Sequence, residues 1–152
     1  MRLTKPVEGA AGMLIRKPAR ECYEAFVDPA VTTNFWFTRS TGRLEEGETV
    51  TWTWEMYGVS SPATARQLAP DEKIVLEWGA PGEASMVELT FRPMAEGTFV
   101  NVRVYDLPGD ADAQVKMAID TSDGFAIVLC GMKAWLEHGL KLRGVDDRWP
   151  SG

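Results

Sequence analysis

Alternating apolar residues in the middle of the chain restrict its fold more than any other feature. In the segment TWTWEMYG, residues 51–58, Trp52, Trp54 and Met56 occupy every second position. Because side chains alternate across a β-strand, these three residues share one face of a predicted strand. This period, apolar on one face and polar on the other, is typical of an antiparallel sheet with one buried face. Further strands are predicted at about residues 63–68, 74–78, 87–91 and 100–104.

A long amphipathic helix follows the strands and can cover the buried face of the sheet. From Thr121, or somewhat earlier, to about Leu142, the residues Phe125, Leu129, Met132 and Leu136 recur at the spacing of one helix face. This stripe is more apolar than a surface helix requires. We therefore expect the helix to lie across the sheet.

The ends of this last helix are marked by residues that favour caps. Asp120 or Ser122 can cap its start, and Gly139 or Gly144 can end it. Capping also explains the acidic residues near its expected start without any catalytic role.

Two short helices are predicted after a first strand at about residues 12–17. Pro18 suits the first turn of a helix that runs to Val27, because the missing N–H costs nothing there. Asp28 precedes a proline and so ends this helix. The same Asp28 can cap a second short helix that runs to about Phe35.

Taken in order, these elements predict an α+β fold of the helix-grip type. Its antiparallel sheet of about six or seven strands wraps around a long C-terminal helix, with two short helices after the first strand. We expect a single domain over residues 1–152, with a core at about 12–143 and short, flexible termini.

Charge and hydropathy disfavour several classes of partner. The net charge is −6 and no run of Lys or Arg occurs, which argues against nucleic acid and anionic membranes. No apolar run approaches the roughly 20 residues of a membrane span, and the first residues lack a secretory signal. We therefore expect a cytoplasmic protein without a membrane span, as a monomer or a homodimer. Cys22 and Cys130, the only cysteines, are expected to be buried and reduced.

Several segments carry a resemblance to known proteins. The stretch RKPARECYEAFVDPAVTTNFW starts a helix with proline, breaks it at Asp-Pro and continues to Trp36, and it looks like the opening of START-like proteins of the SRPBCC superfamily. Residues 74–78 (IVLEW), 87–98 and 123–139 resemble one family of this superfamily, which is named for activators of the heat-shock protein 90 ATPase. Phe125 stands where that family usually has Trp. The resemblance covers about residues 13–139.

This resemblance implies a cavity between the sheet and the helix. Superfamily members bind lipids, hormones or polyketides there, and a few are cyclases or oxygenase domains, so the fold alone does not choose. The family name implies a co-chaperone, but the eukaryotic activator also needs an N-terminal domain, for which we expect no room in 152 residues. We favour a small hydrophobic-ligand or lipid-like binding protein. The alternatives are a co-chaperone-like partner of a chaperone ATPase, and a cyclase- or hydrolase-type enzyme with one buried acid–base residue.

Aromatic and long apolar residues of the sheet and the last helix form the candidate site. They can wall a cavity for a small apolar or aromatic ligand, or they can simply fill the core, and the sequence leaves both open. The expected ligand-binding residues are Trp36, Trp52, Trp54, Met56, Trp78, Phe91, Phe125, Leu129 and Met132.

Residues for catalysis or metal binding are scarce. His138 is the only histidine and is expected to face solvent, which argues against a Ser–His–Asp triad or a multi-histidine metal site. Glu88 and Glu137 are expected to be surface charges, and Cys130 lacks an activating neighbour. We therefore predict no catalytic residue, no metal site and no cofactor, and favour a protein that is not an enzyme.

Overall fold

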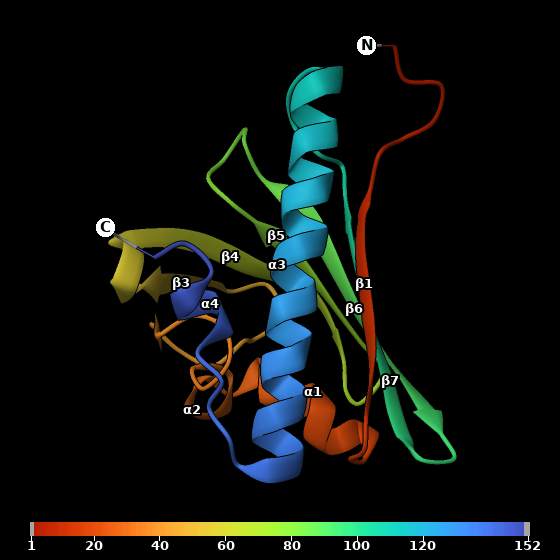
Figure 1. The fold of residues 1–152 in the computed structure, drawn as a ribbon. Coiled ribbons are helices and arrows are strands. Elements are labelled where there is room, and N and C mark those ends of the chain that lie inside the picture. The colour runs from red at the N-terminus through yellow and green to blue at the C-terminus, as the bar shows by residue number, and fades with distance from the viewer. Residues whose placement is uncertain (1, 151–152) are drawn as a thin grey trace.

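One antiparallel sheet curved around one long helix organises the computed structural model, which describes residues 2–150 (Figure 1). The seven strands follow the order β1-β7-β6-β5-β4-β3-β2, and every neighbouring pair is antiparallel. This confirms the predicted helix-grip sheet. The strands are β1 (Gly9–Ile15), β2 (Arg39–Ser40), β3 (Thr49–Trp54), β4 (Val59–Ala69), β5 (Lys73–Trp78), β6 (Ser85–Met94) and β7 (Gly97–Tyr105).

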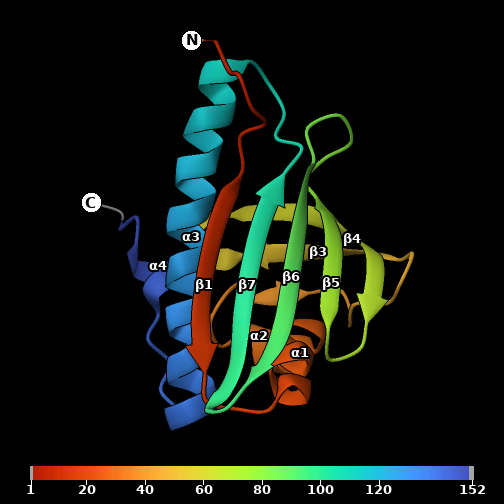
Figure 2. The ribbon, with the colours of Figure 1, turned by 90° about the vertical axis from the view of Figure 1, so that its right-hand side faces the viewer.

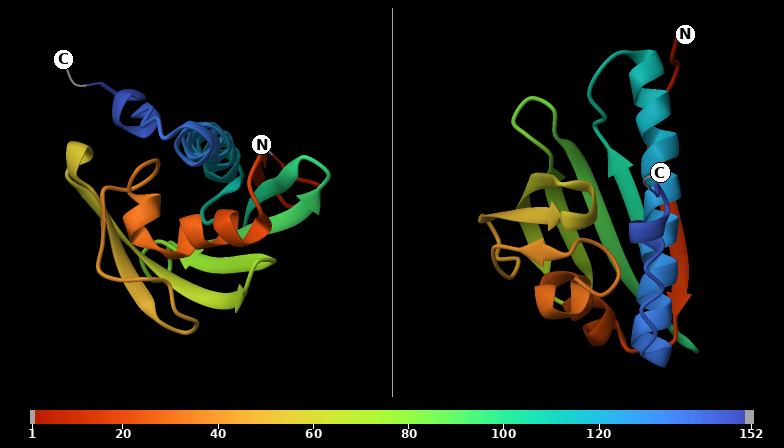
Figure 3. Two further views of the ribbon diagram at one scale, coloured as in Figure 1. Left: turned by 90° about the horizontal axis from the view of Figure 1, so that it is seen from below. Right: turned by 60° about the vertical axis from the view of Figure 1, so that its left-hand side comes forward.

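Two short helices follow β1, as the sequence predicts. Helix α1 spans Ala19–Val27 and helix α2 spans Pro29–Thr32. Asp28 separates them, and its side chain accepts a hydrogen bond of 3.0 Å from the backbone N–H of Ala30 at the start of α2. Both helices lie inside the curve of the sheet, across one end of its concave face (Figures 2 and 3).

The long helix α3 spans Ala111–His138, so it begins well before the predicted start near residue 121. Asp110 caps it by accepting a hydrogen bond of 2.9 Å from the N–H of Ala113. Asp120 and Ser122, the predicted caps, therefore lie inside the helix. The apolar stripe does not mark this start, because Ala118 is the only buried residue in the first four turns. The predicted end is confirmed, since Gly139 adopts a left-handed φ of 65° and caps the helix.

Helix α3 runs beside the edge strand β1. The hydroxyl of Ser122 accepts a hydrogen bond of 3.0 Å from the N–H of Ala10. Gly9 allows this close approach, because a Cβ there would come within 2.4 Å of the Thr121 hydroxyl oxygen. The helix thus covers the β1 edge as well as the open side of the curved sheet (Figure 3).

Strand β3 ends at Trp54, one pair of residues earlier than the alternating pattern suggests. A short 3-10 helix, η1 (Glu55–Tyr57), follows, and Gly58 turns the chain with a left-handed φ of 60°. Trp54 then pairs with Val59 at the start of β4. Met56 therefore lies in the β3–β4 connection and is only partly buried.

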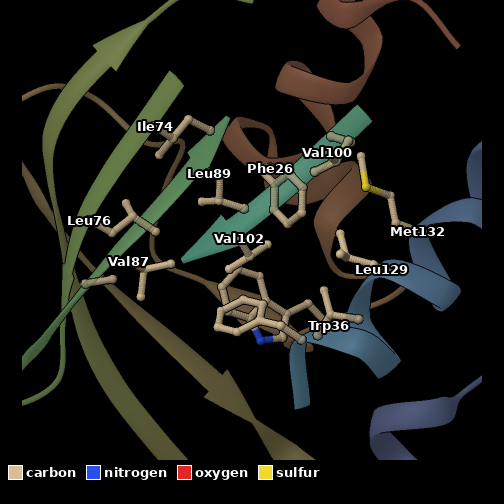
Figure 4. Close-up of a cluster of buried hydrophobic side chains, with 14 of the residues drawn as sticks. Phe26, Trp36, Ile74, Leu76, Val87, Leu89, Val100, Val102, Leu129 and Met132 are labelled. Carbon is tan, nitrogen blue, oxygen red and sulfur yellow. The ribbon is translucent and has the colours of Figure 1, made fainter. Parts of the chain in front are cut away.

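At the end of the sheet covered by α1, apolar side chains fill the space between sheet and α3 (Figure 4). Helix α1 contributes Phe26, strands β6 and β7 contribute Leu89 and Val100, and α3 contributes Leu129 and Met132. Each of these five residues is at most 3% exposed. We call this cluster of five residues the filled end.

After α3 the chain turns back and forms a last short helix, α4 (Gly144–Asp147). Figure 3 shows α4 beside α3, on the side that faces β3 and β4. Residues 144–147 lie beyond the core limit predicted near residue 143. The expectation of flexible termini falls partly on residues 1, 151 and 152, which lie outside the described residues. Among the helices of residues 2–150, none is long and apolar enough to cross a membrane.

Candidate functional site

A pocket of about 440 Å³ lies between α3 and the β3–β5 end of the sheet. It is partly open to solvent, because two residues of its wall, Val59 and Trp149, are about half exposed. The pocket is lined by Trp36, Trp54, Tyr57, Val59, Ser61, Trp78, Asp120, Thr121, Gly124, Phe125, Ile127, Val128, Val145 and Trp149. We call it the hollow end, in contrast to the filled end.

Two tryptophans form the wall of the pocket on the sheet. Trp54 ends β3 and Trp78 ends β5, and both side chains point to the concave face because strand residues alternate. Their ring centroids are 6.0 Å apart with the planes tilted by 31°. They therefore present two broad aromatic surfaces to the interior.

Trp36 lies where the sheet wall meets the helix wall. It follows α2, and its ring centroid is 5.6 Å from Trp78 and 5.2 Å from Phe125 of α3, with both rings edge to face. It also contacts Trp52 at 4.8 Å. Only 6% of Trp36 is exposed, so the surrounding rings hold it in place.

Helix α3 leaves space at one position of its wall. Gly124 lines the pocket, and a Cβ added there would meet no atom within 4 Å. Phe125 and Val128 flank it and are 3% exposed each. The absence of a side chain at Gly124 therefore contributes to the pocket volume.

The outer wall of the pocket joins two segments that are distant in sequence. The hydroxyl of Tyr57 in η1 donates one bifurcated hydrogen bond that the backbone carbonyl oxygens of Val145 and Asp146 in α4 share, the second at 3.1 Å. Its ring lies 6.0 Å from Trp149 in an edge-to-face arrangement. Tyr57, Val145 and Trp149 thus close the side of the pocket that neither the sheet nor α3 covers.

The structure divides the nine expected ligand-binding residues into two groups. Trp36, Trp54, Trp78 and Phe125 line the pocket. The others do not: Met56 lies in η1, while Trp52, Phe91, Leu129 and Met132 are 0–3% exposed in the core.

Trp52 is separated from the pocket although it shares a strand face with Trp54. The ring of Phe37 stacks on it, with centroids 4.8 Å apart and planes 13° apart. Phe37 lies between α2 and β2, outside the alternating segment, so the alternating pattern gives no sign of this cover. The rest of the pocket wall was missed for a similar reason, because Tyr57, Val145 and Trp149 meet only through the fold.

Polar groups in the pocket wall are few. The hydroxyl of Thr121 donates to the carbonyl of Met117 at 2.8 Å, and the carboxylate of Asp120 pairs with Lys116 at 3.0 Å. The Asp120 side chain is 59% exposed, so it lies at the rim. Within residues 2–150, no group of three or more His, Cys, Asp or Glu side chains is arranged to hold a metal ion.

The polar residues singled out in the sequence lie away from the pocket. His138 ends α3 with its side chain 65% exposed, as expected. Cys22 is buried but Cys130 is exposed, so the prediction of two buried thiols is wrong for Cys130. Burial raises the pKa of the Cys22 thiol to about 11, against the opposing effect of its hydrogen bond with Thr98.

Glu137 is a second correction, because its side chain is only 9% exposed and is not a surface charge. The carboxylate accepts hydrogen bonds from the N–H of Arg16 at 3.0 Å and from Lys133 at 2.7 Å. Burial raises its pKa, but these hydrogen bonds and the charge of Lys133 outweigh burial and hold the pKa below its usual value. Glu137 thus joins the end of β1 to the end of α3.

Comparisons with known proteins agree with this architecture. The family described as "Activator of Hsp90 ATPase homolog 1-like protein" matches residues 16–137. No curated protein matches the chain. The crystal structure of SSP2350 from Staphylococcus saprophyticus is 29% identical, with a TM-score of 0.78 over 90% of this chain and 96% of that one.

Two more distant structures share the fold. The Aha1 dimer from Colwellia psychrerythraea is 15% identical, with a TM-score of 0.75 over 88% of this chain and 98% of that one. DynU16, a protein of the dynemicin biosynthetic locus, is 17% identical, with a TM-score of 0.78 over 90% of this chain. The match covers 49% of DynU16, so this chain spans about half the length of that protein.

Proposed function

This chain belongs to the family of Activator of Hsp90 ATPase homolog 1-like proteins, and from that premise we propose that it binds a small, neutral, planar ligand in the pocket between the sheet and α3. The observation that carries the proposal is the pocket of about 440 Å³ with its aromatic wall. Small-molecule sites are typically concave, mainly apolar and about 300–1,000 Å³ in volume.

The shape of the wall favours a flat ligand over a flexible chain. Trp54 and Trp78 offer broad ring faces, and Phe125 of α3 lies 5.9 Å from Trp78. A planar ring system can stack on these faces, and each aromatic pair contributes about 0.5–1.5 kcal/mol beyond the area it buries.

The polar groups of the pocket favour a neutral ligand with hydrogen-bond acceptors. Among residues 2–150, no protein acceptor pairs with the indole N–H of Trp36 or Trp54, and neither nitrogen is sealed from solvent. A carbonyl or ether oxygen of a ligand can accept such a hydrogen bond. Asp120 at the rim and the net charge of −6 disfavour an anionic ligand.

The relatives support a binding protein without deciding its ligand. DynU16 comes from the dynemicin biosynthetic locus, which agrees with a ligand site in this fold. The family name supports the co-chaperone alternative instead. That alternative predicts direct binding to a chaperone ATPase, and a pull-down with the purified chaperone separates it from ligand binding.

The enzyme alternative has little support in the pocket. It requires a buried acid–base group, such as a carboxylate held at the bottom of the cavity. The carboxylate that lines this pocket is Asp120, which is more than half exposed and paired with Lys116. We therefore propose binding rather than catalysis.

Filling the pocket tests the proposal directly. We expect the neutral fluorescent probe N-phenyl-1-naphthylamine to bind the wild-type protein and to quench its tryptophan emission. Gly124→Leu places a side chain in the empty space and should weaken binding at least tenfold, while the matched control Gly124→Ala should weaken it much less.

Thermal unfolding of both variants serves as the control for folding, because Leu and Ala each favour a helix more than Gly does. Native mass spectrometry of the purified protein can identify a ligand that copurifies. If the probe and a panel of neutral aromatic compounds fail to bind the folded wild-type protein, the proposal is wrong.

A further inference from the structure

The chain after α3 supplies a wall that the rest of the fold lacks. We define the C-terminal strap as residues 139–149. Val145 and Trp149 of the strap line the pocket, and α4 lies beside α3 on the side facing β3 and β4 (Figure 3). The family match ends at residue 137. This wall therefore comes from a segment that follows the part of the chain shared with the family.

Few contacts hold the strap in place. The hydroxyl of Tyr57 donates to the carbonyls of Val145 and Asp146, and Arg148 pairs with Asp123 of α3 at 2.9 Å. Gly144 lies against α3, where a Cβ would come within 2.8 Å of the Ile127 Cγ2 atom. Apolar contacts add to these: the ring of Trp149 lies 6.0 Å from that of Tyr57, and Val145 packs partly buried against the core. Together these contacts fix the strap at a small number of points.

The strap also lacks a core of its own. None of the residues of α4 is fully buried, and Leu140, Leu142 and Trp149 are 52–57% exposed. The chain enters α4 through left-handed backbone at Gly139 and Arg143, with φ of 65° and 59°. Segments with little buried apolar surface open at a low free-energy cost relative to the core.

We infer that the strap is a movable wall of the pocket, which contributes Val145 and Trp149 as ligand contacts and limits ligand entry and release. This inference rests on the proposed function, since it concerns the same pocket. When the strap opens, the hydrogen bond of the Tyr57 hydroxyl breaks and the pocket becomes a groove between α3 and the β3–β4 hairpin. A bound ligand that touches Val145 and Trp149 favours the closed position, because it binds the two positions unequally.

Binding kinetics of N-phenyl-1-naphthylamine test the strap separately from the pocket. Tyr57→Phe keeps the ring but removes the bifurcated hydrogen bond from the hydroxyl to the carbonyls of Val145 and Asp146 that holds α4. It should raise both the association and the dissociation rate about fivefold, the effect of one lost hydrogen bond, and change Kd less than either rate. Gly144→Ala, which pushes the strap away from Ile127, should act in the same direction. Leu142→Ala is the matched control on the strap, because Leu142 is exposed and does not line the pocket.

Amide hydrogen exchange gives a second readout that does not depend on the variants. Backbone amides of residues 140–149 should exchange faster than those at the centre of α3, and saturating probe should slow them at least threefold. If the probe binds but neither the rates in Tyr57→Phe and Gly144→Ala nor the exchange of the strap changes, the strap inference is wrong and the binding function stands. If the probe does not bind the wild-type protein at all, both proposals fail.

Discussion

The filled end and the hollow end lie between the same sheet and the same helix, yet one is packed and the other holds a pocket. At the filled end, α1 adds a third layer, and Phe26 closes the space between β6, β7 and α3. At the hollow end, neither α1 nor α2 crosses the concave face, and α3 presents Gly124 instead of a large side chain. In this protein the cavity therefore lies where the two short helices no longer cover the sheet.

Truncation of a core side chain should show this difference most strongly. Leu129→Ala removes a fully buried side chain at the filled end and should lower the free energy of unfolding by about 3–4 kcal/mol. Val128→Ala, one residue earlier on the pocket wall, should cost about 1 kcal/mol, because it enlarges a space that already exists. Urea unfolding measures both variants. Equal costs per carbon atom removed would show that the two ends are packed alike.

The two thiols should differ in chemical reactivity, because one lies at the filled end and the other is exposed. Cys22 in α1 is sealed at the filled end with its pKa raised to about 11 from a usual value of 9.0, whereas Cys130 is exposed. A shift of this size lowers the thiolate fraction near neutral pH about 100-fold. In Cys130→Ser, Cys22 should therefore react with Ellman's reagent at least 100-fold more slowly than Cys130 reacts in Cys22→Ser.

The same shift sets a pH dependence. Because the folded thiol has the higher pKa, folding favours the neutral form, so this contribution to stability is complete below about pH 9. It is lost as the pH rises toward 11. Cys22→Ala should remove this loss of stability at high pH. Chemical unfolding of the variant and the wild type at pH 7 and pH 10.5 measures the difference.

Glu137 tests how the end of α3 is held to the end of β1. Glu137→Gln weakens the hydrogen bonds to Arg16 and Lys133, and should lower stability by about 1–2 kcal/mol at pH 7. Since its folded pKa lies below the usual value of 4.5, the carboxylate stabilises the fold above that pH and loses its effect as the pH falls. The difference between variant and wild type should therefore shrink below about pH 4. A difference that stays constant with pH would contradict this role.

The smallest expected effect compares two glycines of α3. Gly124→Ala should stabilise the protein by up to about 1 kcal/mol, because Ala favours a helix and its Cβ meets nothing within 4 Å. Gly131→Ala gains the same helix propensity, but its Cβ would lie 3.1 Å from the Cβ of Phe35, so the gain should be cancelled or reversed. Thermal unfolding distinguishes them. A stabilising Gly131→Ala with a neutral Gly124→Ala would reverse the assignment of packed and hollow regions.

The order of elements could be predicted because each has a local signal. Period-two alternation marks the strands, and Pro18 and Asp28 mark the helix boundaries. The early turns of α3 lack such a signal, since the helix there runs beside β1 and buries only Ala118. Its true cap, Asp110, therefore stands ten and twelve residues before Asp120 and Ser122, the two predicted caps.

The pocket could be predicted only in part. Alternation places Trp52 and Trp54 on the same strand face. Only Trp54 reaches the pocket, because the ring of Phe37 covers Trp52. The strap sequence carries no amphipathic pattern, and its position depends on Tyr57, which is 88 residues away from Val145 in the chain. Such long-range contacts leave no local trace in one sequence.

The indole rings of the interior form a continuous series, which has an optical consequence. Trp36, Trp52, Trp78 and Trp54 follow one another with centroid distances of 4.8, 6.1 and 6.0 Å. At such separations an electronic excitation passes between rings faster than it is emitted, so the four indoles act as one antenna. Light absorbed by the sealed Trp52 can thus leave through Trp54 or Trp78 at the pocket wall. The tryptophan emission of the protein therefore reports on the pocket, although part of the light is absorbed by the buried Trp52.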